Sequence, residues 1–398
     1  MHIHWIANCV VPPPRSLSGG DRIMVECLRR WGREHRVTVY GWEGTRQLCE
    51  HQQLDNVEHV LWSARRFERG GLPVLFAAQT AVGCREARAV RLDPNEQNVV
   101  VSSSDFIPDS LPALSLKRRY PAVPWVAGFY LFAPPLFSVL AGRPGPGWKF
   151  ASYRPVQRFV LRRILRHAEM ILVTGEEDRE RMIGFGRAPD SVFAVRGGVD
   201  LTIPRAVPEP ESKTYDAVFI GRLHPQKGVR ELLQIWRLVR ARHASARLAI
   251  IGTGPLEAEL RRSCQELQLE DAVDFLGFRD AAPKYEIVKA SRVVVHPAIY
   301  DSGGMAAAEA LACGLPGVAF DLPALKTYYP KGFLKAVPGD LAGFADRVVG
   351  LLTDEPLYRT MSAEATEVGK DWDWDSRAAQ MLAAITARVR ATGSSDGP

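Results

Sequence analysis

Short apolar runs alternate with amphipathic helical patterns through the first half of the chain. The apolar runs predict strands, in chain order His2–Asn8, Arg36–Tyr40, Asn98–Ser102, Trp125–Phe129, Met170–Val173 and Val192–Val195. The amphipathic stretches between them predict helices, which include Gly20–Trp31, Leu72–Arg91, Trp148–His167 and Glu176–Gly184. Alternation of this kind is typical of a parallel sheet with helices on both faces.

The alternation stops at residues 199–216 and then starts again. This segment, VDLTIPRAVPEPESKTYD, contains three prolines and no hydrophobic period, so we interpret it as a linker. Beyond it the pattern predicts strands at Ala217–Ile220, Arg247–Ile251, Val273–Leu276, Arg292–Val295 and Gly317–Phe320. Predicted helices follow at Val229–Arg242, Leu256–Leu267 and Met305–Cys313. The sequence therefore predicts an α/β fold with two Rossmann-like, doubly wound domains, residues 1–205 and 206–370.

Composition is that of a soluble globular protein, with 46% hydrophobic and 24% charged residues among 398. The six cysteines form no CxxC pair and no cluster with histidine, which favours reduced thiols over disulfides or a zinc site. No signal peptide is recognisable before the first predicted strand, so a cytoplasmic location is expected. Residues 393–398 are small or polar and are expected to be disordered.

The net charge of +6 is concentrated in the first domain. Residues 1–205 carry 28 basic and 20 acidic side chains, and five of the basic ones lie in one predicted helix: Arg154, Arg158, Arg162, Arg163 and Arg166. Such a helix suits anionic lipid headgroups, a phosphorylated acceptor or nucleic acid, or it is simply a solvated face. The uncharged stretch 122–141 contains three prolines, so we predict a buried strand and an apolar loop there rather than a membrane span.

The segment Tyr300–Ala319, YDSGGMAAAEALACGLPGVA, carries the most specific chemistry. Glycines lead into a run of small residues that favours a helix, and backbone N–H groups at such a point suit a phosphate. The flanking carboxylates, Asp301 and Glu309, are suited to accept hydrogen bonds from hydroxyl groups. Phosphate and hydroxyls together describe a nucleotide-sugar, whereas the simpler alternative is a capped helix without a ligand.

A second motif, FIGRLHPQKG, lies at Phe219–Gly228, where a predicted strand ends. Arg222 follows the carboxyl end of that strand, and Lys227 stands at the start of the next helix. Open α/β sheets bind ligands at the carboxyl ends of their strands. Arginine can hold a phosphate through two hydrogen bonds, and lysine adds a compact positive charge.

These two motifs resemble the donor site of the retaining group-one (family four) glycosyltransferases, whose signature is Glu-x7-Glu followed by EA-ACG-P. Residues 309–316, EALACGLP, fit the signature, but the first acidic residue here is Asp301, one methylene shorter than glutamate. The resemblance implies the B-type glycosyltransferase fold, with two Rossmann-like domains facing each other across a cleft. It also implies a last helix, residues 371–392, that crosses back onto the first domain.

The resemblance implies four catalytic residues. Arg222 and Lys227 would contact the diphosphate, Glu309 the ribose and Asp301 the sugar. Further donor contacts are implied at Gly19, Gly20, Gly221, Gly252, Gly254, Gly277, Phe278, Ser302, Gly303, Gly304 and Met305. For the glycines an alternative stays open, because close packing or a positive φ angle also requires glycine.

Acceptor binding is expected at Ser104 and Asp105, which follow a predicted strand, and at Tyr130. Relatives often carry a histidine in the central strand of the first domain, whereas this sequence reads GFYLF at 128–132. For Ser104 and Asp105 a helix cap is the alternative.

The resemblance implies transfer of a sugar, with retention, from a nucleotide diphosphate-sugar to an acceptor hydroxyl, without a cofactor or a metal. The expected acceptor is a glycan or a lipid-linked molecule of cell-envelope, polysaccharide or glycolipid synthesis. The expected place is the cytoplasm, with peripheral contact to an anionic membrane through the first domain and no nucleic acid as partner. A nucleotide-sugar epimerase, a glucan polymerase and a non-catalytic scaffold of the same fold stay open, as do the donor base, the sugar and the oligomeric state.

Overall fold

The computed structural model describes residues 1–10, 18–133, 148–300, 304–323, 325 and 329–393. The chain forms two compact units. Unit 1 comprises Met1–Ala133, Ser152–Val195 and Asp375–Pro398, and unit 2 comprises Pro134–Ala151 and Arg196–Trp374. Apart from the segment 134–151, which is grouped with unit 2, the boundaries fall at 195/196 and 374/375, whereas the sequence pattern placed them at 205/206 and 370/371.

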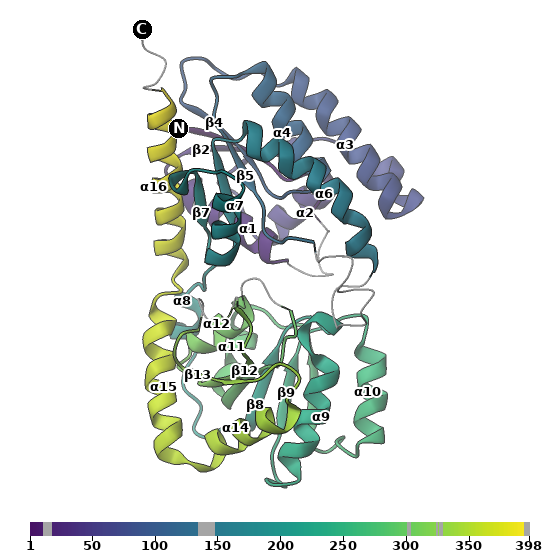
Figure 1. Cartoon of the computed structure of the whole chain (residues 1–398), viewed down its shortest axis with the longest axis vertical. Helices are drawn as coiled ribbons and strands as arrows, with labels where there is room; N and C mark the ends of the chain where they lie inside the picture. Colours follow the sequence, from purple (N-terminus) through teal and green to yellow (C-terminus); the bar gives the residue numbers. More distant parts are fainter. Residues whose placement is uncertain (11–17, 134–147, 301–303, 324, 326–328, 394–398) are drawn as a thin grey trace. The chain divides into compact units, whose positions relative to one another are not determined.

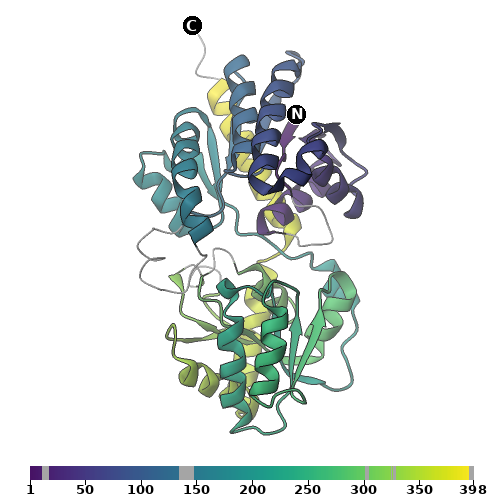
Figure 2. The same ribbon diagram turned by 90° about the vertical axis from the view of Figure 1, so that its right-hand side faces the viewer.

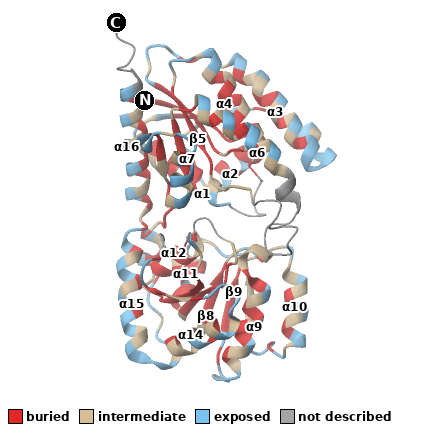
Figure 3. Cartoon of the chain, viewed as in Figure 1, coloured by how far each residue is buried: buried red, intermediate tan, exposed pale blue. Residues whose placement is uncertain are grey.

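Unit 1, in its described part, contains a seven-stranded parallel sheet with the strand order β3-β2-β1-β4-β5-β6-β7 (Figure 1). The strands are His2–Ile6 (β1), Arg36–Gly41 (β2), Glu58–Leu61 (β3), Asn98–Ser102 (β4), Trp125–Gly128 (β5), Met170–Val173 (β6) and Val192–Ala194 (β7). Most of these strands are buried (Figure 3), which explains why they read as near-continuous apolar runs. The exception is β3, an exposed edge strand that the apolar pattern did not predict.

The helices of unit 1 include α1, which begins at a capping box formed by Ser18 and Asp21. The C-terminal helix α16 packs on this unit: the indole N–H of Trp31 donates to the Ala378 carbonyl oxygen at 3.1 Å, and Arg388 pairs with Asp190 at 2.8 Å. The helices are Gly19–Trp31 (α1), Glu43–His51 (α2), Gly71–Ala89 (α3), Ile107–Arg119 (α4), Trp148–His167 (α6), Glu176–Gly184 (α7) and Trp374–Gly393 (α16), with 3-10 turns at Arg65–Gly70 (η1) and Pro189–Ser191 (η2).

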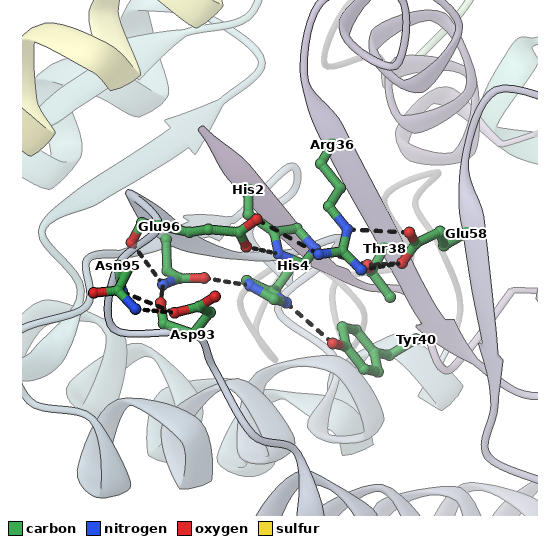
Figure 4. Close-up of polar contacts among 10 residues, drawn as sticks. His2, His4, Arg36, Thr38, Tyr40, Glu58, Asp93, Asn95 and Glu96 are labelled. Atoms are coloured by element: carbon green, nitrogen blue, oxygen red, sulfur yellow. Dashed lines mark hydrogen bonds and ion pairs between the residues drawn. The ribbon is translucent and has the colours of Figure 1, made fainter.

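A buried polar network joins the amino ends of β1, β2 and β4 (Figure 4). His2 contacts the Glu96 carboxylate through Nδ1 and the Thr38 hydroxyl through Nε2, both at 2.8 Å. Thr38 in turn donates its hydroxyl hydrogen to the carboxylate of Glu58 at 3.0 Å. Every polar side chain buried at this edge of the sheet therefore meets a partner from a neighbouring strand or loop.

His4 continues this network one step further along β1 (Figure 4). Its Nε2 lies 2.8 Å from Oδ1 of Asn98, and its Nδ1 lies 3.0 Å from the hydroxyl group of Tyr40. Because Asn98 Oδ1 can only accept, Nε2 carries a proton and Nδ1 accepts from the tyrosine. Burial lowers the pKa of His4 to about 4, so the ring is neutral at physiological pH.

Unit 2, in its described part, contains a six-stranded parallel sheet with the order β10-β9-β8-β11-β12-β13 (Figure 1, Figure 2). Its strands are Tyr215–Ile220 (β8), Leu248–Ile251 (β9), Val273–Gly277 (β10), Ser291–His296 (β11), Gly317–Phe320 (β12) and Phe333–Ala336 (β13). Its helices are Thr202–Ala206 (α8), Val229–Arg240 (α9), Glu257–Glu266 (α10), Ala281–Lys289 (α11), Met305–Leu311 (α12), Leu341–Thr353 (α14) and Glu355–Lys370 (α15), with a 3-10 turn at Pro225–Lys227 (η3).

The predicted linker 199–216 is largely part of unit 2, which corrects the interpretation from its prolines. Its start pairs with the chain before α16, because the N–H of Val199 donates to the Trp372 carbonyl oxygen. Its middle forms α8, and Lys289 of α11 donates to the Val207 carbonyl oxygen at 2.6 Å. Proline at the third position of so short a helix, Pro204, costs no internal hydrogen bond.

Both sheets contain a point where the strand order reverses. In unit 1 the chain builds outward from β1 to β3 and then returns to pair β4 with β1; in unit 2 it does the same with β8 and β11. At such a point the loops leaving the two neighbouring strands run apart, and ligands bind between them. Each unit therefore has one favoured place for a site, at the carboxyl ends of these strand pairs.

The described residues include no helix that is both long enough and apolar enough to cross a bilayer. Of the uncharged stretch 122–141, β5 accounts for the predicted buried strand, and the predicted apolar loop from residue 134 lies outside the described residues.

Candidate functional site

The loops after β8, β9 and β10 form one backbone platform at the carboxyl edge of unit 2. The N–H of Gly221 donates to the Ile251 carbonyl oxygen at 3.0 Å, and the N–H of Gly252 donates to the Gly277 carbonyl oxygen at 2.9 Å. Leu223 and Thr253 add a further bond of 3.0 Å between the first two loops. Backbone bonds of this kind fix the loops without using side chains.

Two of the predicted donor glycines are required by the packing of this platform itself. Gly252 has φ +143°, and a Cβ atom there would lie 1.9 Å from the carbonyl oxygen of Gly221. A Cβ atom on Gly254 would lie 2.4 Å from the carbonyl oxygen of Leu223. Close packing thus accounts for these glycines without a ligand.

Gly277 is different, because it lies at the rim of the platform. It has φ +70°, but a Cβ atom would have only an Arg279 side-chain atom nearby, at 3.9 Å. The next residue, Phe278, has 48% of its surface exposed. A planar ligand can stack on an exposed aromatic ring such as that of Phe278, which lies next to the free space around Gly277.

The loops leaving β8 and β11 are tied together. The carbonyl oxygen of Gln226 accepts hydrogen bonds from the N–H groups of Ile299, at 3.1 Å, and Tyr300, at 3.4 Å. Gly228 has φ +65°, and a Cβ atom there would lie 1.8 Å from the carbonyl oxygen of Pro297. The turn that carries Lys227 is therefore held against the segment that leads to Asp301.

This loop pair is electropositive. Arg222 is exposed at the carboxyl end of β8, and Lys227 is half-buried at the end of η3. Burial first, and then the charges of Arg222 and Lys227, lower the pKa of His224 between them. Two positive side chains on one short loop suit an anionic ligand such as a diphosphate.

The helix α12 is the next element of the chain after β11 and carries Glu309. Gly304, its N-cap, has φ +49°, and a Cβ atom there would lie 2.1 Å from the Tyr329 hydroxyl oxygen. Met305 is the first helical residue and is half-buried. The predicted site residues Asp301, Ser302 and Gly303 lie outside the described residues.

Glu309 forms an ion pair that the sequence analysis missed. Its Oε1 lies 2.8 Å from Nζ of Lys284, which is nearly fully buried and also contacts Asp280 at 3.2 Å. The Glu309 side chain keeps 20% of its surface exposed, so the carboxylate can still accept hydrogen bonds from a ligand. A lysine in the first turn of α11 is a signal that could have revealed this contact, because a cation is unfavourable at a helix N-terminus unless a carboxylate compensates it.

At the carboxyl edge of unit 1, Asp109 organises the ends of β1 and β4. Its carboxylate accepts from the N–H of Asn8 and the hydroxyl of Ser104, each at 2.5 Å, and from the Cys9 thiol at 3.3 Å. The side chain is almost fully buried, and burial raises its pKa to about 7. Asp109 was not predicted, although a carboxylate in the first turn of a mostly apolar helix was its visible signal.

Two of the predicted acceptor residues, Ser104 and Asp105, lie near Asp109. Their side chains already form hydrogen bonds within the protein. Ser104 donates to Asp109 and also accepts from the N–H of Phe106 at 3.2 Å, but it does not cap α4, whose N-cap is Phe106 without a side-chain hydrogen bond. Asp105 is buried and accepts from the Gln157 amide at 2.8 Å, and burial raises its pKa to about 6. These groups reach a ligand only if part of the network rearranges.

Tyr130 and Gly20 lie next to each other in unit 1. A Cβ atom on Gly20 would lie 3.1 Å from a ring carbon of Tyr130, so a larger residue would press on the ring. Burial raises the pKa of Tyr130 above its ordinary value, which keeps the hydroxyl protonated. Gly19 is exposed in the first turn of α1, next to the Ser18 cap.

We expect the buried carboxyl of Asp109 to make stability depend on pH. Its folded pKa, about 7, lies above the unfolded value, so its stabilising contribution is complete in acid and is lost as pH rises through 7. When the pH rises from 5 to 8, the free energy of unfolding of the wild type should therefore fall by about 2–3 kcal/mol more than that of Asp109→Asn. Denaturant unfolding at both pH values measures this difference between variant and wild type. The exposed control Asp55→Asn should show none, and an equal, pH-independent cost for Asp109→Asn would contradict the expectation.

Within the described part of the chain, no group of three or more His, Cys, Asp or Glu side chains could hold a metal ion, and all six cysteines are free thiols.

Comparison with known proteins finds relatives for the part of the chain that carries this site. Residues 202–368 match the family described as Glycosyl transferases group 1. The glycogen synthase of Mycobacterium tuberculosis (strain H37Rv) is 25% identical over 283 residues, which cover 70% of this chain and 65% of the relative. The D-inositol 3-phosphate glycosyltransferase of Kribbella flavida is 30% identical over 246 residues, 56% of this chain and 57% of the relative. The chain thus spans less than two thirds of the length of these relatives.

Solved structures share the fold over nearly the whole chain. The structure of Anabaena Alr3699/HepE in complex with UDP-glucose matches this chain with a TM-score of 0.73 and 15% sequence identity. The match covers 97% of this chain and 100% of the HepE chain. Sucrose-phosphate synthase from Thermosynechococcus elongatus has a TM-score of 0.70 at 19% identity, with 98% and 99% covered. The two Rossmann-like units are therefore those of the B-type glycosyltransferase fold, as predicted. Residues 202–368, within unit 2, are thus similar to the group 1 glycosyl transferases.

Proposed function

We propose that the chain is a retaining glycosyltransferase, which moves a sugar from a nucleotide diphosphate-sugar to a hydroxyl group of an acceptor. The joining of the loops after β8 and β11 is the observation that supports this most. It holds the loop that carries Arg222 and Lys227 against the chain that leaves β11, inside the part of the chain that matches the family model. HepE, which shares this fold, was solved with UDP-glucose.

In the proposed reaction the bond between the anomeric carbon and the diphosphate breaks, and a bond from that carbon to the acceptor oxygen forms on the same face. The proton of the acceptor hydroxyl passes to the departing phosphate. Arg222 and Lys227 stabilise the charge that develops on this leaving group, so we propose that the reaction needs neither a metal ion nor a cofactor. Glu309 would hold the ribose hydroxyls, and Asp301 would hold the sugar.

The proposed acceptor is a glycan or a lipid-linked molecule, used in the cytoplasm for cell-envelope or polysaccharide synthesis. Support comes from the kinds of relatives, which include a putative colanic acid biosynthesis glycosyltransferase of Salmonella typhimurium, 27% identical over 163 residues. We propose that Ser104, Asp105 and Tyr130 contact the acceptor after the Asp109 network opens, and that the first turn of α1 at Gly19 and Gly20 contacts the donor phosphates.

A thermal-shift panel of UDP-, GDP-, ADP- and TDP-sugars tests the proposal. One base should raise the melting temperature clearly, because a ligand at about 100 times its Kd stabilises by about 2.7 kcal/mol. The matching nucleoside monophosphates are the controls, since they lack the second phosphate that Arg222 and Lys227 would bind. The stereochemistry of the product, read by NMR of the anomeric proton, then tests retention. Absence of any shift would reject the donor site and favour a non-catalytic scaffold.

A further inference from the structure

The helix α3 shows an uncharged, apolar surface to solvent. Residues 70–84 contain no charged side chain, although α3 is a surface helix (Figure 1, Figure 3). Leu72 has 64% of its surface exposed and Val74 has 47%. Ala77 and Ala81 continue the exposed stripe at helical spacing.

The inner side of the same helix makes this arrangement unusual. A surface helix normally buries its apolar stripe and turns polar residues outward. Here Leu75 and Val82 are buried as usual, but Gln79, the long polar side chain of the segment, is also buried, with 1% exposed. Its Oε1 has no hydrogen-bond partner among the described residues. The helix α3 therefore buries one polar side chain, Gln79, among apolar ones, while other apolar side chains stay exposed to solvent.

Arginines stand at both ends of the apolar stripe. All of them are exposed: Arg65, Arg66 and Arg69 in η1, and Arg85, Arg88 and Arg91 at or just after the end of α3. The only carboxylates from residue 65 to residue 91 are Glu68 and Glu86. We call the exposed stripe and these six arginines the α3 surface.

We propose that the α3 surface docks on an anionic lipid surface. An apolar stripe can enter the boundary between headgroups and acyl chains, and arginines at its ends can contact anionic headgroups. A second copy of the chain is a poorer occupant, because a two-fold contact between two α3 surfaces would bring arginines toward arginines.

The sequence suggested the arginine-rich helix α6 for a contact with anionic lipids. This helix has exposed arginines, but among its described side chains it lacks an exposed apolar stripe like that of α3. Arg158, Arg162 and Arg166 form an exposed stripe on it. The exposed aromatic between them, Phe159, is covered by the guanidinium group of Arg163, 3.4 Å from the ring centroid. This face of α6 is charged and solvated, and we assign the lipid contact to α3 instead.

Flotation with vesicles tests the proposal on the full chain, without donor or acceptor. Vesicles of phosphatidylcholine alone should bind weakly, and vesicles that also contain phosphatidylglycerol should bind clearly. Leu72→Asp/Val74→Asp should lower the second partition coefficient about tenfold or more. Val337→Asp is the matched control, because Val337 is 65% exposed in unit 2 and should leave binding unchanged.

The arginines are tested separately. Arg65→Ser/Arg66→Ser/Arg69→Ser should weaken binding by about fivefold for each charge removed, and only with the anionic vesicles. The α6 variant Arg158→Ser/Arg162→Ser/Arg166→Ser should change binding less than this.

Three outcomes would overturn the proposal. The first is wild-type binding by Leu72→Asp/Val74→Asp; the second is a larger loss from the α6 variant than from the α3 variants. The third is a lipid-free dimer that Leu72→Asp/Val74→Asp dissociates, measured by light scattering, since a second copy would then occupy the surface. None of these results depends on the proposed transfer reaction, so the two proposals fail separately.

Discussion

Turnover should fall about 10- to 100-fold when Arg222 is replaced by alanine. The guanidinium group is exposed at the carboxyl end of β8, on the loop that is tied to the chain leaving β11. In the proposed reaction it contacts the diphosphate, whose charge increases as the sugar departs. A hydrogen bond to a charged group contributes about 1.5–3 kcal/mol, which corresponds to this range in rate.

The measurement is kcat and KM with the donor that the thermal-shift panel selects. A group that acts mainly in the transition state should lower kcat and kcat/KM together, with a smaller change in KM. Arg262→Ala is the control, because Arg262 is an exposed arginine on α10 in the same unit. Near-normal turnover of Arg222→Ala, with donor binding unchanged, would remove Arg222 from the mechanism.

Replacing Lys284 by methionine should weaken donor binding about tenfold and also lower stability. Methionine keeps much of the volume but removes the charge that pairs with Glu309 at 2.8 Å and Asp280 at 3.2 Å. The two carboxylates would then repel each other and the donor phosphates. Because both carboxylates are partly exposed, solvent reduces the cost, and we expect a loss of about 1–3 kcal/mol in the free energy of unfolding.

Lys289→Met provides the matched control for this prediction. Lys289 lies on the same helix and is also buried, but it donates to Val207 and pairs with Glu209, outside the site. It should lose stability without a specific loss of donor affinity. The double variant Lys284→Met/Glu309→Gln should recover part of the stability lost in Lys284→Met, which a double-mutant cycle measures. Equal donor affinity in Lys284→Met and Lys289→Met would show that Lys284 only supports the fold.

The sequence predicted the two doubly wound domains because buried parallel strands read as apolar runs. Arg222 and Lys227 could be predicted as site residues for the same reason, since they follow the carboxyl end of such a run, and their role stays a prediction. The ion pair of Glu309 was missed, because Lys284 is distant in sequence and becomes a neighbour only when α11 and α12 pack on the sheet. The position of Lys284 near the start of α11 was a signal for a carboxylate partner, but it did not say which one. Asp109 was missed in the same way, as its partners come from the end of β1.

Elements at the margins of the sheets were harder to predict than the central strands. The edge strand β3, with the sequence EHVL, is exposed along its length and so lacks the apolar signal of a buried strand. The segment 199–216 looked like a linker because its buried apolar side chains, Val199, Leu201 and Val207, follow neither a helical nor a strand period. Its other contacts, with α11 and with the chain before α16, involve its backbone groups, which leave no pattern in the sequence.

The histidine network of unit 1 has a consequence for how the chain finds its strand register. Only one pairing of β1 with β4 brings the His4 ring to Asn98, and only one pairing with β2 brings His2 to Thr38. A slip by one residue would turn both rings to the opposite face of the sheet. Each imidazole buried without partners costs about 1–3 kcal/mol, so misaligned intermediates would be penalised before the sheet closes. The polar network at the amino edge of this sheet thus favours the correct strand register during folding.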